Sequence, residues 1–171
     1  MLGNMDDDRR TLCKVAGLAL LGTALPACGN NSNAVDMGPL ACSSSAVAVG
    51  MQITDVPMNA AVFFSLPDTT IWLCRDDNGV YAMDAECTHL GCPAKPTSAD
   101  PNADPVAGMS YANLSAGFAC NCHGATYDAN GQHPTAPAPS PLKHYLVCAT
   151  VSGVAVVDTQ QVVDPSIRYH L

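Results

Sequence analysis

The sequence contains little positive charge. Lys and Arg together number 7 in a chain of 171 residues, whereas Asp and Glu number 15, which gives a formal net charge of −8. Surfaces that bind nucleic acid need clustered Lys and Arg to neutralise phosphates, and surfaces that adsorb to anionic lipid headgroups need the same. The composition therefore excludes nucleic acid as a partner and argues against direct adsorption to anionic lipid.

Long apolar runs and helical periodicity are also lacking. No uncharged apolar run reaches the roughly 18 residues that a transmembrane helix needs. From residue 28 onward, apolar residues do not recur with the period of an amphipathic helix. Charged residues make up only 13% of the chain and hydrophobic residues 48%, which excludes a wholly disordered protein. The length leaves room for one domain and little more.

Residues 1–27 have the pattern of a targeting signal. Arg9 and Arg10 precede an uncharged apolar stretch, Val15 to Ala27. A basic region followed by an apolar stretch this short is typical of a signal peptide and not of a membrane span. The paired arginines resemble a twin-arginine export signal. We therefore expect export to the periplasm.

The end of this signal resembles a bacterial lipobox. Leu25-Pro26-Ala27 precedes Cys28, which in such signals is lipidated and becomes the first residue of the mature protein. Ordinary cleavage after Ala27, with Cys28 free or disulfide-bonded, is the alternative. Residues 28–45 are rich in Gly, Asn and Ser and predict a flexible tether. We expect attachment to the inner or outer membrane by this lipid anchor, without a transmembrane helix.

The rest of the chain predicts short β-strands. Turn signals at Asp76–Gly79 and at Ser152-Gly153 each separate two β-favouring runs, as in hairpins. A small antiparallel all-β domain follows from this pattern. Residues 85–141 carry few strand signals but hold four cysteines and three of the five histidines. A segment that cannot build its own core needs a metal or disulfides. The predicted strands cover residues 46–50, 61–65, 71–75, 80–84, 144–151 and 154–158.

Two short boxes of cysteine and histidine lie in that segment. The first runs from Cys87 to Cys92 (CTHLGC), and the second from Cys120 to Ala125 (CNCHGA). In each box a tight loop can aim one cysteine and one histidine at a common centre. Two thiolates and two imidazoles suit a borderline or soft metal. Each box holds one further cysteine, Cys92 or Cys122, and the two can form a disulfide in an exported protein.

Two other interpretations of the boxes are a zinc site and a pure disulfide framework. Structural zinc sites usually offer cysteines separated by two to four residues, and the spacing of Cys87 and His89 differs from that pattern. A disulfide framework does not explain why both boxes combine cysteine, histidine and a following glycine.

Both boxes closely resemble those of the Rieske iron–sulfur family. The resemblance covers residues 46–158 and implies an antiparallel β-sandwich base with a small cluster-binding subdomain inserted at about residues 85–141, leaving residues 159–171 as a C-terminal tail. It implies one 2Fe-2S cluster. By this resemblance, Cys87 and Cys120 ligate one iron, His89 and His123 ligate the other, and Cys92 pairs with Cys122 in a disulfide.

The resemblance extends to residues that tune such a cluster. Leu90 would cover the cluster and shape a docking surface. Pro137 and Pro139 lie in a segment similar to the family's proline loop. Ala125 stands where high-potential members have a serine that donates to a bridging sulfide. Tyr127 occupies the place of an aromatic residue whose hydroxyl can bond a cysteine ligand.

One stretch departs from the family pattern. Thirty residues separate His89 from Cys120, whereas the family commonly has about half that number. Residues 94–116 therefore contain an insertion rich in Pro, Asp, Asn and Ser. We expect a solvated loop there, with a partner-docking element as the alternative. The sequence does not decide how Cys42, Cys74 and Cys148 pair, and we interpret His133, His144 and His170 as structural or exposed.

The function that these patterns predict is electron transfer by an exported, lipid-anchored protein. No nucleotide-binding glycine motif or nucleophile elbow is present, so we expect no stand-alone catalysis. The negative net charge predicts a redox partner with a basic face, such as a cytochrome. The alternatives are the Rieske subunit of a quinol-oxidising cytochrome bc-type complex, the small subunit of an arsenite-oxidase-like enzyme, and, in another class, a zinc-stabilised binding module.

Overall fold

The computed structural model describes residues 40–171. The predicted signal, Cys28 and the first part of the predicted tether lie outside this range. The described residues form strands, turns and two 3-10 helices of three residues each, η2 (Ile53–Asp55) and η3 (Leu114–Ala116), so the expected all-β class is confirmed. The strands are β1 (Val47–Gln52), β2 (Ala60–Ser65), β3 (Thr70–Asp76), β4 (Gly79–Asp84), β5 (Lys95–Pro96), β6 (Ser110–Ala112), β7 (Phe118–Cys120), β8 (Ala125–Tyr127), β9 (His144–Ala149) and β10 (Val154–Val163).

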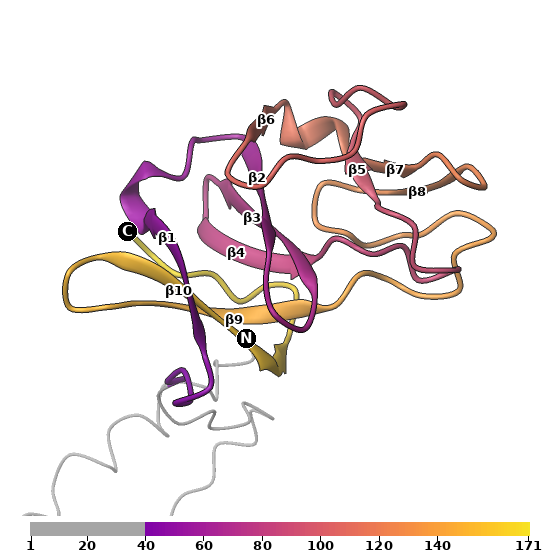
Figure 1. Ribbon diagram of the computed structural model, residues 1–171. Coiled ribbons are helices and arrows are strands. Elements are labelled where there is room, and N and C mark those ends of the chain that lie inside the picture. The colour runs from indigo at the N-terminus through magenta and orange to yellow at the C-terminus, as the bar shows by residue number, and fades with distance from the viewer. Residues whose placement is uncertain (1–39) are drawn as a thin grey trace, which may run out of the picture. The chain divides into compact units, whose positions relative to one another are not determined.

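These strands form two antiparallel sheets of unequal size. The larger sheet has seven strands in the order β1-β10-β9-β4-β3-β2-β6, and we call it the base. The smaller sheet has the order β5-β7-β8 and belongs to the segment that carries both boxes. In Figure 1 the smaller sheet and its long loops lie together at one side of the molecule, beyond the ends of β3 and β4.

Turn chemistry explains the first hairpin. The Asp76 carboxylate accepts hydrogen bonds from the backbone N–H groups of Asn78 at 2.8 Å and Gly79 at 3.1 Å. Gly79 has a φ of 136°, and a Cβ there would collide with the Tyr169 carbonyl. Only glycine both adopts this positive φ without strain and leaves the space that a Cβ would fill. The predicted turn is therefore confirmed, and it also leaves room for the C-terminal residues to pair beside β4.

The final strand is longer than the sequence predicts. We expected it to end at Asp158, but β10 continues to Val163 after an irregularity between Asp158 and Val162. Beyond this bulge, Val162 pairs with Tyr145 and Val163 with His144. The polar residues Thr159, Gln160 and Gln161 form the bulge, and they interrupt the apolar pattern from which a strand would be predicted. The predicted tail 159–171 therefore begins inside a strand.

Strand alternation divides the core into two layers. On one face of β2, β3 and β4, side chains such as Phe63, Trp72 and Met83 pack toward the box-bearing segment, including Cys87 and Cys120. The opposite face packs against the other strands of the base and contains Val62, Phe64, Ile71, Leu73, Val80, Ala82, Val147 and Val157. The period-2 pattern of a strand produces this division. The base thus supplies one wall of the candidate site.

The insertion is only partly the solvated loop that we expected. Residues 97–109 are turns and bends with mostly exposed side chains. In contrast, Ser110–Ala112 forms β6 on the edge of β2, and Leu114 is 2% exposed. Tyr111 packs edge-on against Trp72, with ring centroids 5.4 Å apart. The prediction does not hold for buried residues 94–96, for β6 or for Leu114, because strands of two or three residues are too short to show alternation.

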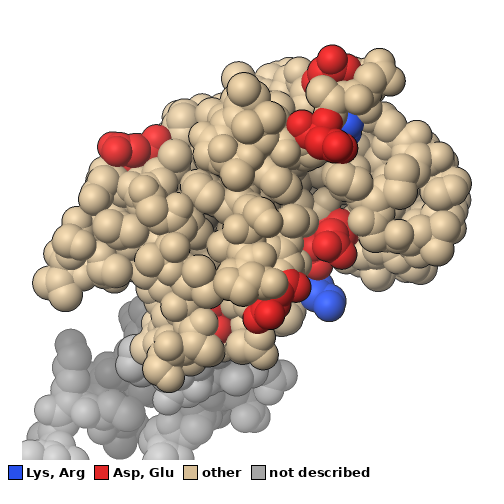
Figure 2. Space-filling view, viewed as in Figure 1, with Lys and Arg blue, Asp and Glu red and all other residues tan. Residues whose placement is uncertain are grey.

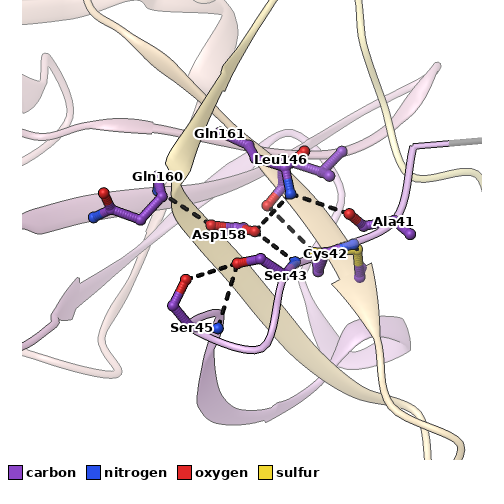
Figure 3. The surroundings of a disulfide bond; sticks show 9 residues. Ala41, Cys42, Ser43, Ser45, Leu146, Asp158, Gln160 and Gln161 are labelled. Carbon is purple, nitrogen blue, oxygen red and sulfur yellow. Dashed lines mark hydrogen bonds between the residues drawn. A yellow bond between two sulfur atoms is a disulfide. The ribbon is translucent and has the colours of Figure 1, made fainter.

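The start of the described chain is held against the base (Figure 3). Cys42 forms a disulfide with Cys148 of β9. The Ser43 N–H donates to the Asp158 carboxylate at 2.7 Å, and the Gln161 side chain donates both to this carboxylate at 2.7 Å and to the Ala41 carbonyl at 3.0 Å. Residues 41–43 of the predicted tether are thus part of the folded domain. The structure also settles the cysteine pairing, since Cys74 is buried and free.

Candidate metal centre

The first box is a tight turn that returns to its own start. The Cys87 N–H donates to the Cys92 carbonyl at 2.7 Å, and the Gly91 N–H donates to the Cys87 carbonyl at 2.9 Å. Gly91 has a φ of 75°, a conformation that glycine adopts without strain. Just beyond the box, the Ala94 N–H donates to the Ala85 carbonyl at 2.8 Å. The turn therefore places both cysteines and His89 within one small loop.

The second box is the loop of the β7–β8 hairpin. Cys120 ends β7 and lies opposite Ala125, the first residue of β8. The Gly124 N–H donates to the Cys120 carbonyl at 2.9 Å, and Gly124 has a φ of 82°. His123 is therefore held next to Cys120 at the tip of the hairpin, as the sequence spacing predicts.

The two loops place their thiols inside and their imidazoles toward solvent. Cys87 and Cys120 are 2% and 1% exposed. His89 is half-buried and His123 is exposed, and their ring centroids lie 4.7 Å apart at nearly perpendicular planes. All four residues that the sequence singles out are thus brought together, with the histidines at the outer edge.

These four side chains fit a metal cluster. Burial raises the pKa of the Cys120 thiol, and a hydrogen bond to Cys87 raises it further. The Cys120 thiol thus holds its proton until a cation replaces it. Nδ1 of His89 is also buried and has no hydrogen-bond partner in the described part of the chain. An unsatisfied buried polar atom costs about 1–3 kcal/mol, and coordination to a metal would remove that cost.

A disulfide joins the two loops. Cys92 and Cys122 are bonded to each other, and their sulfurs lie within 4.8 Å of the Cys120 sulfur. Three sulfurs this close could suggest a metal site of their own. However, a disulfide offers no thiolate, so Cys92 and Cys122 cross-link the loops beside Cys120.

Tyr127 and Thr88 connect the first box to its surroundings. The Tyr127 hydroxyl donates to the Cys87 sulfur at 3.3 Å and accepts from the Thr88 N–H at 3.1 Å. Burial raises the pKa of Tyr127, and the bond to Cys87 adds to the effect, so the hydroxyl remains a donor. The Thr88 hydroxyl donates to the Ser140 carbonyl at 2.7 Å, which ties the proline loop to the box. Sequence reasoning missed this role of Thr88, although its place inside the box was a signal.

The remaining predicted site residues surround the two boxes. Ala125 is fully buried and presents no donor. Leu90 is 70% exposed next to His89 and therefore forms part of the outer surface. In the proline loop, Pro137 and Pro139 are exposed, whereas Ala138 between them is buried in the core layer that contains Cys87 and Cys120. The loop thus contacts the site through Ala138 and faces solvent with its prolines.

Comparison with known proteins is consistent with this centre. Residues 46–146 match the family described as Rieske [2Fe-2S] domain. A curated relative, the cytochrome b6-f complex iron-sulfur subunit of Chlorobaculum tepidum, is 33% identical over 101 residues, which are 59% of this chain and 47% of that protein. The subunit of the same description from Synechococcus sp. (strain JA-3-3Ab) is 41% identical over 80 residues, covering 45% of this chain and 37% of the relative. The chain therefore spans about half or less of the length of these relatives.

Solved structures with a related outline include two iron–sulfur proteins. The ferredoxin of carbazole 1,9a-dioxygenase from Nocardioides aromaticivorans IC177 aligns with a TM-score of 0.45 and 18% identity, covering 67% of this chain and 97% of the ferredoxin. The soluble domain of Rieske protein II from Sulfolobus acidocaldarius aligns with a TM-score of 0.42 and 21% identity, covering 66% of this chain and 75% of that domain. Since the family match spans residues 46–146 and both boxes fall inside it, the chain belongs to the Rieske [2Fe-2S] domain family, and its cofactor is one 2Fe-2S cluster.

Proposed function

We propose that this protein transfers electrons through a cluster held by Cys87, His89, Cys120 and His123. The observation that carries the proposal is their arrangement, with two buried thiols inside and two imidazoles at the solvent edge. When bound, the cluster supplies a one-electron carrier whose potential is raised by its histidine ligands. The chain itself excludes water from the cysteine side and exposes the histidine side to a partner.

Leu90 and the charge distribution support a partner that docks at the histidine edge. Leu90 offers an exposed apolar contact next to His89. Acidic side chains are spread over the face drawn in Figure 2, where basic side chains are sparse. With a net charge of −8, the chain favours encounter with a basic redox protein, such as a cytochrome.

A second candidate is the Rieske subunit of a quinol-oxidising complex. The two curated relatives named above are described as cytochrome b6-f complex subunits, and their similarity to this chain favours this candidate. Among the described residues, no helix is long and apolar enough to cross a membrane. An arsenite-oxidase-like enzyme remains a further host for the same electron-transfer role.

Export and lipid anchoring complete the proposal. The twin-arginine pattern at Arg9 and Arg10 and the lipobox at Cys28 are sequence features. The two disulfides of the described chain support an oxidising compartment, such as the periplasm, because disulfides are rare in reducing cytosol. We also propose that the Rieske domain, predicted at residues 46–158, extends to the end of β10 at Val163 and that residues 85–141 form its cluster-binding subdomain.

Metal and spectroscopic analysis of the purified full chain tests electron transfer against a zinc-stabilised module. We expect a reddish-brown protein with two irons per chain and a Rieske-type spin resonance signal after reduction. A colourless protein with stoichiometric zinc would overturn the proposal.

Cell fractionation tests export and anchoring separately. Replacing Arg9 and Arg10 by Lys should retain the protein in the cytoplasm, whereas Cys28→Ser should release it from membranes into the periplasm. Cys74→Ser serves as the matched control, since that cysteine is buried and free in the domain. Unchanged membrane attachment of Cys28→Ser would contradict the lipid anchor.

A further inference from the structure

Lys95 is a buried cation beside the second box. Its residue is 7% exposed, and in β5 it lies opposite Ala119, the neighbour of Cys120. Among the described residues, the side-chain ion pairs are Arg168 with Asp76 and His133 with Asp128. Lys95 therefore has no ion-pair partner within 4.0 Å in the described part of the chain, although Asp100 and Asp104 line the same cavity. Burying an unpaired charge is costly, so a fold that retains one must satisfy it by hydrogen bonds.

Backbone carbonyls of the insertion satisfy this ammonium. Nζ of Lys95 donates to the carbonyl oxygens of Asp100 at 3.2 Å, Pro101 at 2.7 Å and Ala103 at 2.9 Å. An ammonium group has three hydrogens to donate, so its donor capacity is filled. Because carbonyl groups carry no net charge, these hydrogen bonds satisfy the ammonium without placing a negative charge in contact with it.

One of these carbonyls also connects the insertion to the second box. The Pro101 oxygen accepts a second hydrogen bond, at 3.1 Å, from the side-chain amide of Asn121. Asn121 stands between Cys120, a proposed ligand, and Cys122, which is in the disulfide. The insertion is therefore folded around Lys95 and attached to the loop that carries half of the proposed ligands.

We propose that Lys95 is a positioning residue that orders residues 97–109 against the second box and, through its buried positive charge, raises the reduction potential of the cluster. The inference rests on the proposed electron-transfer function. Reduction adds one electron, supplied by a redox protein, and so adds one negative charge to the cluster. A fixed cation in a region of low dielectric constant stabilises the reduced form more than the oxidised form. Salt screens a buried charge of this kind only weakly.

Protein-film voltammetry of the full chain tests the charge. Lys95→Gln and Lys95→Met remove it, and Lys95→Arg keeps it. The matched control is Lys143→Gln, which removes the same charge at the exposed lysine of the described chain. We expect Gln and Met at position 95 to lower the equilibrium constant for reduction about tenfold, which is about 59 mV for one electron. Arg at position 95 and Gln at position 143 should change it by much less.

A second readout reports the positioning role without the cluster. In cluster-free protein, amide hydrogen exchange of residues 97–109 should accelerate in Lys95→Gln and return toward wild type in Lys95→Arg. Equal exchange in wild type and Lys95→Gln would overturn the claim that Lys95 orders the insertion.

Each voltammetric outcome decides the proposal. The proposal would be supported if Lys95→Arg holds the cluster and Lys95→Gln and Lys95→Met do not, because a positive charge at position 95 would then be required. A potential in Lys95→Gln equal to that in Lys143→Gln would overturn it. Failure of all three position-95 variants, including Arg, would also overturn it, because the shape of lysine and not its charge would be needed. If wild type and Lys143→Gln hold no 2Fe-2S cluster, the proposed function itself fails.

Discussion

The base and the box-bearing segment are stabilised by different means. Strands β2, β3 and β4 of the base have six or seven residues each, and β2 and β3 pair over six successive positions. The strands β5, β7 and β8 of the smaller sheet have only two or three residues. The base relies on burial of apolar side chains, such as Leu73 and Val157. The smaller sheet packs Phe118 against Trp72 of the base and relies in addition on the Cys92–Cys122 disulfide and on polar contacts around Cys87.

This difference separates folding from function. A long regular sheet buries enough apolar surface to be stable without a cofactor, whereas strands of two or three residues do not. The box-bearing segment is therefore free to arrange its loops for a metal while the base keeps the chain folded. We expect changes in the loops to abolish the cluster with little effect on the base, and changes in the base to act on global stability.

The largest expected effect is loss of the cluster on removal of a ligand. Cys87→Ala or Cys120→Ala should abolish the 2Fe-2S absorption completely, because a thiolate ligand to iron is removed. Circular dichroism should still report a folded β protein. Cys74→Ala is the matched control, since Cys74 is equally buried and free but lies on β3 of the base. Full loss of the cluster in Cys74→Ala would contradict the assignment.

The two disulfides should separate stability from cluster binding. Cys42 and Cys148 are 106 residues apart, and a loop of about 100 residues gives about 4.7 kcal/mol by the chain-entropy estimate. Cys92 and Cys122 are 30 residues apart and should contribute about 3–4 kcal/mol. Denaturant unfolding of the two double Ser variants should show the larger loss for the first pair. Only the second pair should weaken cluster retention, and equal cluster loss in both variants would break the comparison.

Tuning of the potential should be a smaller effect confined to the loops. Tyr127→Phe removes the 3.3 Å hydrogen bond to Cys87 and should lower the potential, whereas Ala125→Ser adds a donor and should raise it. A hydrogen bond to a charged group contributes about 1.5–3 kcal/mol. Because only the difference between oxidation states counts, each shift should be tens of millivolts, up to about 100 mV. Voltammetry measures the potential of both variants. An unchanged potential in Tyr127→Phe would show that the hydrogen bond from Tyr127 to Cys87 does not tune the potential.

The smallest expected effect is a pH dependence at the junction of the two regions. Burial lowers the pKa of His144 below its usual value, although the hydrogen bond that Nε2 donates to the Asn130 carbonyl acts in the opposite direction. The folded state therefore binds its proton less readily than the unfolded state. Stability from the neutral ring is fully present above the unfolded pKa of about 6.5 and is lost as pH falls below it.

A variant without the titrating ring checks this sign. His144→Gln should flatten the decline in unfolding free energy between about pH 7 and pH 5, and exposed His170→Gln should leave the decline as it is. A steeper decline in His144→Gln than in wild type would contradict the argument.

The sequence alone was sufficient where a few neighbouring residues decide the structure. The Asp76–Gly79 turn and the two β-favouring runs that flank it follow from local chemistry, and both were confirmed. Each box also brings its own cysteine and histidine together, because a loop of a few residues limits how far apart they can lie. The resemblance of the two boxes to the Rieske family gave the cofactor. The division of the cysteines into ligands and cross-link stays a prediction until variants are measured.

Only the tertiary structure decided the features that join distant parts of the chain. The pairing of Cys42 with Cys148, the addition of β6 to the edge of β2, and the hydrogen bond from Asn121 to the Pro101 carbonyl all depend on contacts that sequence spacing does not constrain. A residue finds such a partner because the whole sheet closes and excludes water, and not because of its immediate neighbours. For this reason the sequence predicted the chemistry of the site, whereas the contacts around the site that tune this chemistry came only from the tertiary structure.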